Sequence, residues 1–72
     1  MAFHMKLKAL RQAQNLTLRK LGEKAGVSYS LLNSIENGRM QPSKDVALAL
    51  AIALKLEDKD ELISLAANAS DG

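Results

Sequence analysis

Apolar residues recur along this sequence at the spacing of an α-helix, and the alternation typical of strands is absent. Leu18, Leu21, Gly22 and Ala25, for example, fall at positions i, i+3, i+4 and i+7 and therefore share one face of a helix. Residues that favour turns separate such segments. The pattern predicts five short helices, at about residues 3–14, 18–25, 29–37, 44–56 and 58–69.

Capping residues support these boundaries. Thr17, Ser28 and Ser43 precede the second, third and fourth predicted helices, where a hydroxyl can accept a hydrogen bond from a free backbone N–H. Gly26 and Gly38 follow the second and third helices, where glycine adopts a left-handed conformation at little cost. The fourth predicted helix is apolar on nearly every side, as is typical of the central helix of a bundle. We therefore predict an all-α, compact five-helix bundle forming a single domain over residues 1–69, with a frayed C-terminus at 70–72.

The composition restricts where the chain can act. Seventy-two residues are close to the lower size limit for a core without disulfides, and cysteine is absent, as expected in a reducing cytoplasm. Lys6 and Lys8 interrupt any apolar signal-peptide region, and the longest apolar run, residues 46–54, has nine residues where roughly 20 are needed to cross a bilayer. We expect a cytoplasmic protein that does not enter membranes.

Patterns for catalysis or metal binding are absent from the sequence. His4 is the single histidine, and no nucleophile–histidine–acid set, phosphate-binding glycine loop or carboxylate pair can be assembled. We expect that the chain is not an enzyme and binds neither a cofactor nor a metal.

Charge is distributed unevenly along the chain. Residues 1–44 contain eight lysines and arginines against two glutamates, a net charge of +6, whereas residues 45–72 carry a net charge of −4. A basic first part favours a polyanionic partner. The alternative is an ordinary solvated surface, and charge alone does not choose between the two.

The second and third predicted helices have the spacing of a DNA-binding helix-turn-helix. This motif needs a small residue where its helices cross, a glycine in the turn, and apolar residues that fix the second helix against the first. Counted from Leu18 as position one, the matching residues are Gly22 at five, Gly26 at nine, Val27 at ten, Leu32 at fifteen and Ile35 at eighteen.

The third predicted helix also has an uncharged polar face. Ser30, Asn33, Ser34 and Asn37 fall at i, i+3, i+4 and i+7. A helix exposed only to solvent usually carries lysine and glutamate there, whereas short hydroxyl and amide side chains can approach base edges and exchange hydrogen bonds with them. This face favours a helix that reads DNA over one that is polar for solubility alone.

From Leu7 to Leu65, the chain resembles the Xre/Cro-like family, the repressors of lambdoid phages and their bacterial relatives. The resemblance is carried by LTLRKLGEKAGVSYSLLNSIENGRMQPS (residues 16–43), by ALALAIALKL (47–56) and by the acidic start of the last predicted helix. The ENG at 36–38, followed by a basic residue and a proline, is especially typical. The resemblance implies a lambda-repressor-like fold that binds double-stranded DNA.

The resemblance also implies roles for individual residues. The base-reading positions would be Tyr29, Ser30, Asn33 and Ser34. The positions that meet the phosphate backbone would be Thr17, Leu18, Arg19, Lys20, Asn37, Gly38 and Arg39. Leu18 departs from the family pattern, in which glutamine is common. Since leucine cannot bond a phosphate, Thr17, Arg19 or Lys20 would have to compensate.

Glu36 lies four residues after Leu32, near the apolar side of its predicted helix, where an unpaired carboxylate would be costly to bury. The family often pairs this acid with an arginine of the first helix, and Arg11 is the matching residue. We expect a structural ion pair between Arg11 and Glu36, the alternative being a solvated Glu36.

One reading helix covers about four base pairs, too few to select one site in a genome, so we expect a homodimer with reading helices about 34 Å apart. The expected interface is the apolar C-terminal set Leu56, Leu62, Ile63, Leu65 and Ala66. The alternative is a monomer that pairs only on DNA. The predicted function is a dimeric transcriptional repressor that reads a palindromic operator. The alternative function is an antitoxin or other protein-interaction module of the same fold, with a toxin as partner.

Overall fold

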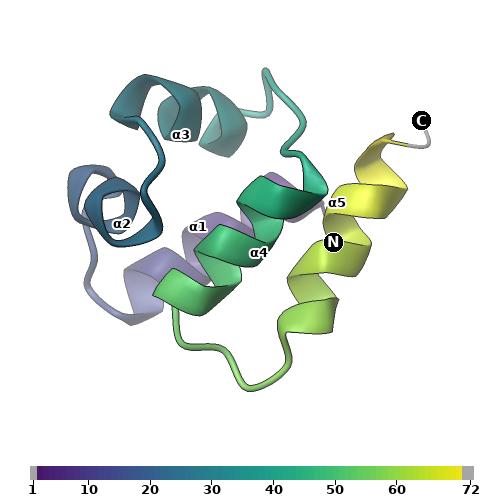
Figure 1. Ribbon diagram of the computed structural model, residues 1–72. Helices are drawn as coiled ribbons and strands as arrows, with labels where there is room; N and C mark the ends of the chain where they lie inside the picture. Colours follow the sequence, from purple (N-terminus) through teal and green to yellow (C-terminus); the bar gives the residue numbers. More distant parts are fainter. Residues whose placement is uncertain (1, 71–72) are drawn as a thin grey trace.

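The computed structural model describes the backbone of residues 2–70 and the side chains of residues 2–66. Over residues 2–70 it contains five α-helices and no strand (Figure 1). The helices are α1 (Phe3–Ala13), α2 (Leu18–Ala25), α3 (Tyr29–Glu36), α4 (Lys44–Ala53) and α5 (Lys59–Ser70). The predicted all-α, five-helix fold is confirmed. Ser70, placed in the predicted frayed end, still belongs to α5, and residues 71–72 lie outside the described part.

The five helices enclose one apolar core. α4 packs against α2 and α5, while α1 packs against α3 and α5. In Figure 1, α1 lies behind α4, with α5 on one side and the α2–α3 pair on the other. The largest fully buried side chains are Leu7, Leu21, Leu32, Ile35, Leu50, Leu54 and Leu62. Burial contributes about 1.5–3 kcal/mol to stability for each such side chain. Every helix supplies at least one of them.

Side-chain hydroxyls begin three of the helices. Thr17, Ser28 and Ser43 each accept a hydrogen bond from the backbone N–H three residues further along, at 3.0, 3.2 and 3.1 Å respectively. Each bond satisfies an N–H group that has no carbonyl partner within its helix. The three predicted caps are confirmed.

Left-handed residues end four of the helices. Asn15 and Lys55 both have φ 57°, and Gly26 and Gly38 have φ 71° and 75°. In each case the N–H of the next residue donates to the carbonyl five residues earlier, at 2.9 to 3.2 Å. These bonds satisfy carbonyl groups that the helix leaves free. Both predicted glycine stops are confirmed.

The sequence prediction for the end of α4 is wrong. The helix was expected to reach about Leu56, but it ends at Ala53 because Lys55 adopts the left-handed conformation. The side-chain amide of Gln14 donates to the carbonyl of Leu54 at 2.6 Å and ties the end of α1 to this turn. Apolar periodicity continues through Leu56, which concealed the stop.

α4 is also less central than its composition indicated. Ala47, Leu50 and Ala51 are fully buried, but Leu48 and Ile52 are 39% and 56% exposed. The faces against α2 and α5 are covered, and one apolar face remains open. Within residues 2–70, no helix combines the length and the apolar character that a membrane span requires.

Candidate nucleic-acid interface

α2 and α3 cross closely at a glycine. A Cβ atom on Gly22 would lie 2.7 Å from the carbonyl oxygen of Val27 and 3.8 Å from a methyl carbon of Leu32. The N–H of Val27 donates to the carbonyl of Gly22 at 2.9 Å, and the left-handed Gly26 lies in the turn between the helices. These contacts hold α3 at a fixed angle to α2, as Figure 1 shows.

α3 buries one face and offers another to solvent. Leu32 and Ile35 are fully buried in the core. Tyr29 is 50% exposed and Ser30 is also exposed, while the next turn presents the half-buried Asn33 and Ser34. The structure therefore brings the four predicted base-reading residues together on one accessible, uncharged face of α3.

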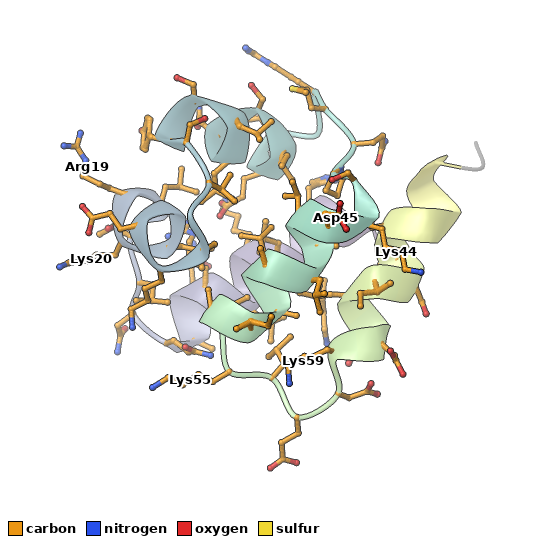
Figure 2. All side chains as sticks on the ribbon, viewed as in Figure 1. Arg19, Lys20, Lys44, Asp45, Lys55 and Lys59 are labelled. Atoms are coloured by element: carbon orange, nitrogen blue, oxygen red, sulfur yellow. The ribbon has the colours of Figure 1, made fainter. Side chains whose placement is uncertain are left out.

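A basic side chain of α2 contacts the first residue of α3. The guanidinium carbon of Arg19 lies 5.8 Å from the centre of the Tyr29 ring, within the range of a cation–π contact. Figure 2 shows Arg19 and Lys20 projecting from α2 away from the bundle. The contact orients Tyr29 beside a cation, and no helical spacing in the sequence indicated it.

The N-terminus of α2 has its own donors. The hydroxyl oxygen of Thr17 accepts the capping bond, which leaves its proton free to be donated to an anion. The N–H groups of Leu18 and Arg19 have no carbonyl within the helix to bond. The side chain of Leu18 packs against the core, so this residue can offer an anion its backbone alone. The side chains of Arg19 and Lys20 are exposed and supply the positive charge.

The end of α3 carries the remaining predicted phosphate contacts. Asn37, Gly38 and Arg39 are all exposed. The side-chain amide of Asn37 donates to the side-chain oxygen of Asn33 at 3.3 Å. This bond leaves the amide N–H groups of Asn33 free to donate, and it joins the polar face of α3 to the exposed end of the helix.

The predicted ion pair between Arg11 and Glu36 is present. Nε of Arg11 lies 2.6 Å from Oε2 of Glu36, and Nη2 donates to Oε1 at 3.1 Å. Nη1 of the same arginine donates to the carbonyl of Leu16 at 2.7 Å. The two side chains are 13% and 5% exposed. This bidentate pair fixes the end of α3 against α1 and the α1–α2 loop.

The crossed helices α2 and α3 lie within a segment of the chain that matches a known family. A family model described as helix-turn-helix covers residues 7–62, from α1 into α5. The chain belongs to the Xre-like helix-turn-helix family. The resemblance found in the sequence is confirmed.

Relatives of this Xre-like chain include two proteins of Mycobacterium tuberculosis H37Rv. The transcriptional regulator ClgR is 40% identical over 50 residues, which are 69% of this chain and 45% of ClgR. An uncharacterized HTH-type transcriptional regulator is 34% identical over 50 residues, which are 69% of this chain and 36% of that protein. The chain thus spans less than half the length of these relatives. It matches no solved structure.

The C-terminal apolar set of the Xre-like chain is divided by the structure. Leu62 and Ala66, with exposures of 0% and 2%, belong to the core of a single copy. Leu56, Ile63 and Leu65 are half-buried and also pack against that core. The expectation that these five residues exceed what one copy can bury is therefore wrong for Leu62 and Ala66. The sequence analysis did not identify Leu48 and Ile52 as exposed apolar residues. The signal that could have found them was that α4 is apolar on nearly every side, more than one bundle can cover.

Proposed function

We propose that this Xre-like chain binds double-stranded DNA sequence-specifically and regulates transcription, with repression as its mode. The observation that carries the proposal is the exposed, uncharged polar face of α3, which is bordered by Arg19, Lys20 and Arg39. The regulators named above, which share 40% and 34% of the aligned residues, support the assignment.

In the proposed complex, α3 lies in the major groove with its N-terminal end deepest. Ser30 is exposed at that end, and Tyr29 presents an apolar ring and a hydroxyl beside it. Hydroxyls both donate and accept, so Ser30 and Ser34 can each bond a base edge, and Asn33 can donate from its free amide N–H groups.

The phosphates on either side of the groove provide most of the affinity. The first turn of α2 would hold one strand through the hydroxyl of Thr17, the free N–H groups and the cations Arg19 and Lys20. The end of α3 would meet the other strand through the side chains of Asn37 and Arg39, with Gly38 allowing the backbone to approach closely; the N–H of Gly38 itself donates to the carbonyl of Ile35 at 3.1 Å. These contacts fix the register of α3 without reading sequence.

Two copies would bind one palindromic operator. A single α3 contacts about four base pairs, and two-fold symmetry of the protein places two such helices about 34 Å apart on one face of the duplex. Occupancy of an operator by a compact dimer would exclude polymerase sterically.

A pair of substitutions tests the proposal. Arg39→Ala should weaken binding to operator and random DNA alike, because a phosphate contact carries no sequence information. Ser30→Ala should weaken operator binding selectively, by about 1–3 kcal/mol, if a good base contact is lost. The operator is first selected from a random DNA pool, and affinities are then measured by fluorescence anisotropy.

Matched controls lie away from α2 and α3. Ser64→Ala removes an exposed hydroxyl from α5, and Lys59→Ala removes a cation from its first turn, far from Arg19 and Lys20 in Figure 2. Neither should change DNA affinity by more than about twofold. Equal losses on operator and random DNA for Ser30→Ala would show that the polar face does not read bases.

A further inference from the structure

A charged and apolar stripe runs along the open face of α4. It consists of Asp45, Leu48, Ile52 and Lys55, hereafter the α4 stripe. The spacing i, i+3 and i+7 places Asp45, Leu48 and Ile52 along one side of α4. Lys55 follows in the turn, two residues after the helix ends. Leu48 and Ile52 are among the most exposed large apolar side chains of the described residues, at 39% and 56%. Figure 2 shows Asp45 and Lys55 at opposite ends of the helix.

The two charges of the stripe are available to a partner. Salt bridges in the described part of the chain join Lys6 to Glu61 and Arg11 to Glu36, and neither involves Asp45 or Lys55. Nor does the side chain of either residue form a hydrogen bond within the described residues. Along the chain, the α4 stripe therefore carries a negative charge, two apolar side chains and a positive charge. Within the described residues, neither charged side chain has a partner.

We propose that the α4 stripe is the surface through which two copies of this chain pair, with the two α4 helices antiparallel. The inference rests on the proposed binding of two copies to one operator. A two-fold axis at the level of position 50 sets Leu48 of one copy against Ile52 of the other. The same axis brings Asp45 of each copy to Lys55 of the second copy, because positions 45 and 55 are equally far from 50. One symmetry operation satisfies all four residues.

Charge decides between this arrangement and others. If the helices ran parallel, Asp45 would meet Asp45 and Lys55 would meet Lys55, and like charges in contact are unfavourable. The order of charges in the α4 stripe favours a second copy over any other partner, because an antiparallel second copy places opposite charges and apolar side chains against each other. The C-terminal interface predicted from the sequence also has less support than the α4 stripe, because Leu62 and Ala66 are already buried within one copy.

The size of the stripe predicts a weak dimer. Stable interfaces cover about 800 Å² on each partner, roughly a sixth of the 4542 Å² accessible surface of this chain. Three side chains of the ten-residue helix α4, together with Lys55 just beyond its end, cover less than that. Pairing is therefore transient in free solution and becomes firm when DNA holds two copies together. α3 packs against α1 and α2, and the stripe contains no residue of α3, so the reading face stays open in the pair.

A charge-reversal cycle tests the antiparallel pairing. Self-association of the 72-residue chain is measured by sedimentation velocity up to millimolar concentration, without DNA. D45K alone and K55D alone should each raise the dissociation constant about tenfold or more, because symmetry replaces two ion pairs with two like-charge contacts. The double variant D45K/K55D restores both pairs and should return to within about twofold of wild type.

Controls separate the stripe from general charge and surface effects. Glu23→Lys and Lys8→Asp change net charge as much as D45K and K55D do, at exposed positions of α2 and α1, and should leave association unchanged. Ile52→Ala should weaken pairing, whereas Met5→Ala, at the same 56% exposure on α1, should not. Circular dichroism verifies that each variant is folded.

Three outcomes would overturn the inference: a monomer at every concentration, single reversals without effect, or a double variant that fails to recover. Binding to a DNA half-site is measured in parallel. If the inference alone fails, the reversal variants still bind half-sites and palindromes as wild type does. If the proposed function fails, no variant binds DNA selectively, whatever the association measurements give.

Discussion

Two glycines of the α2–α3 unit are required for different physical reasons. Gly22 has a close neighbour, since a Cβ atom there would lie 2.7 Å from a backbone oxygen that cannot rotate away. Gly26 has open space around it but a φ of 71°, which residues with a Cβ rarely adopt. One glycine is needed for packing and the other for backbone conformation.

Alanine at each position should therefore destabilise the fold to a different degree and for a different reason. Gly22→Ala should cost about 1–3 kcal/mol through overpacking, even though alanine favours helices by about 1 kcal/mol. Gly26→Ala should cost about 1–2 kcal/mol through strain. Urea unfolding measures both, with Ser64→Ala as a near-neutral control. A Gly22→Ala variant as stable as wild type would show that the turn can shift aside.

The Arg11–Glu36 pair stabilises the fold as a unit. Removing one partner leaves a poorly compensated charge in a site where the side chains are 13% and 5% exposed. Arg11→Met should cost roughly 3 kcal/mol, and the double variant R11M/E36L should recover most of that loss because no charge is then left buried. A double-mutant cycle in urea measures the coupling. Additive losses would mean that the two side chains act independently.

Among the helices, beginnings were more predictable than ends. The capping roles of the Thr17, Ser28 and Ser43 hydroxyls can be predicted from local sequence, because each accepts a hydrogen bond from the backbone N–H only three residues away. The end of α4 at Lys55 has no such local signal, since lysine is not a typical left-handed residue. The turn is held by a hydrogen bond from Gln14 to the carbonyl of Leu54, forty residues later, which periodicity cannot reveal.

The strain at Lys55 predicts a stabilising substitution. Left-handed backbone costs a lysine about 1–2 kcal/mol, and glycine removes that cost while adding about 0.5–1 kcal/mol of unfolded-state entropy. Lys55→Gly should therefore raise the free energy of unfolding by about 0.5–1 kcal/mol, measured at micromolar concentration to keep any self-association small. Lys55→Ala, which loses the same charge but keeps the strain, should give no gain. Equal effects of the two variants would exclude strain relief.

At the scale of the whole molecule, sequence reasoning found the exposed polar face of α3 but not the exposed apolar side chains of α4. The polar face of Ser30, Asn33, Ser34 and Asn37 follows from helical spacing within α3. The family resemblance implied the base-reading role that includes Tyr29, the phosphate contacts and the Arg11–Glu36 pair. Which apolar residues stay exposed depends on how five helices share one core. Leu62 and Ile52 look alike in sequence, yet one is fully buried and the other is 56% exposed.

The distribution of basic residues predicts how DNA binding responds to salt. Arg19, Lys20 and Arg39 are exposed near the polar face of α3, so two copies bound as proposed would present six cations to phosphate. Neutralising about six phosphates gives a slope near −5 in a plot of log affinity against log salt concentration. Arg39→Ala removes one contact from each copy and should reduce the slope by about 2, while Lys59→Ala, distant from α3, should leave it unchanged. Anisotropy titrations on one operator between low and physiological salt measure these slopes. A flat salt response would contradict a phosphate-contacting surface, and an unchanged slope for Arg39→Ala would place that residue off the DNA.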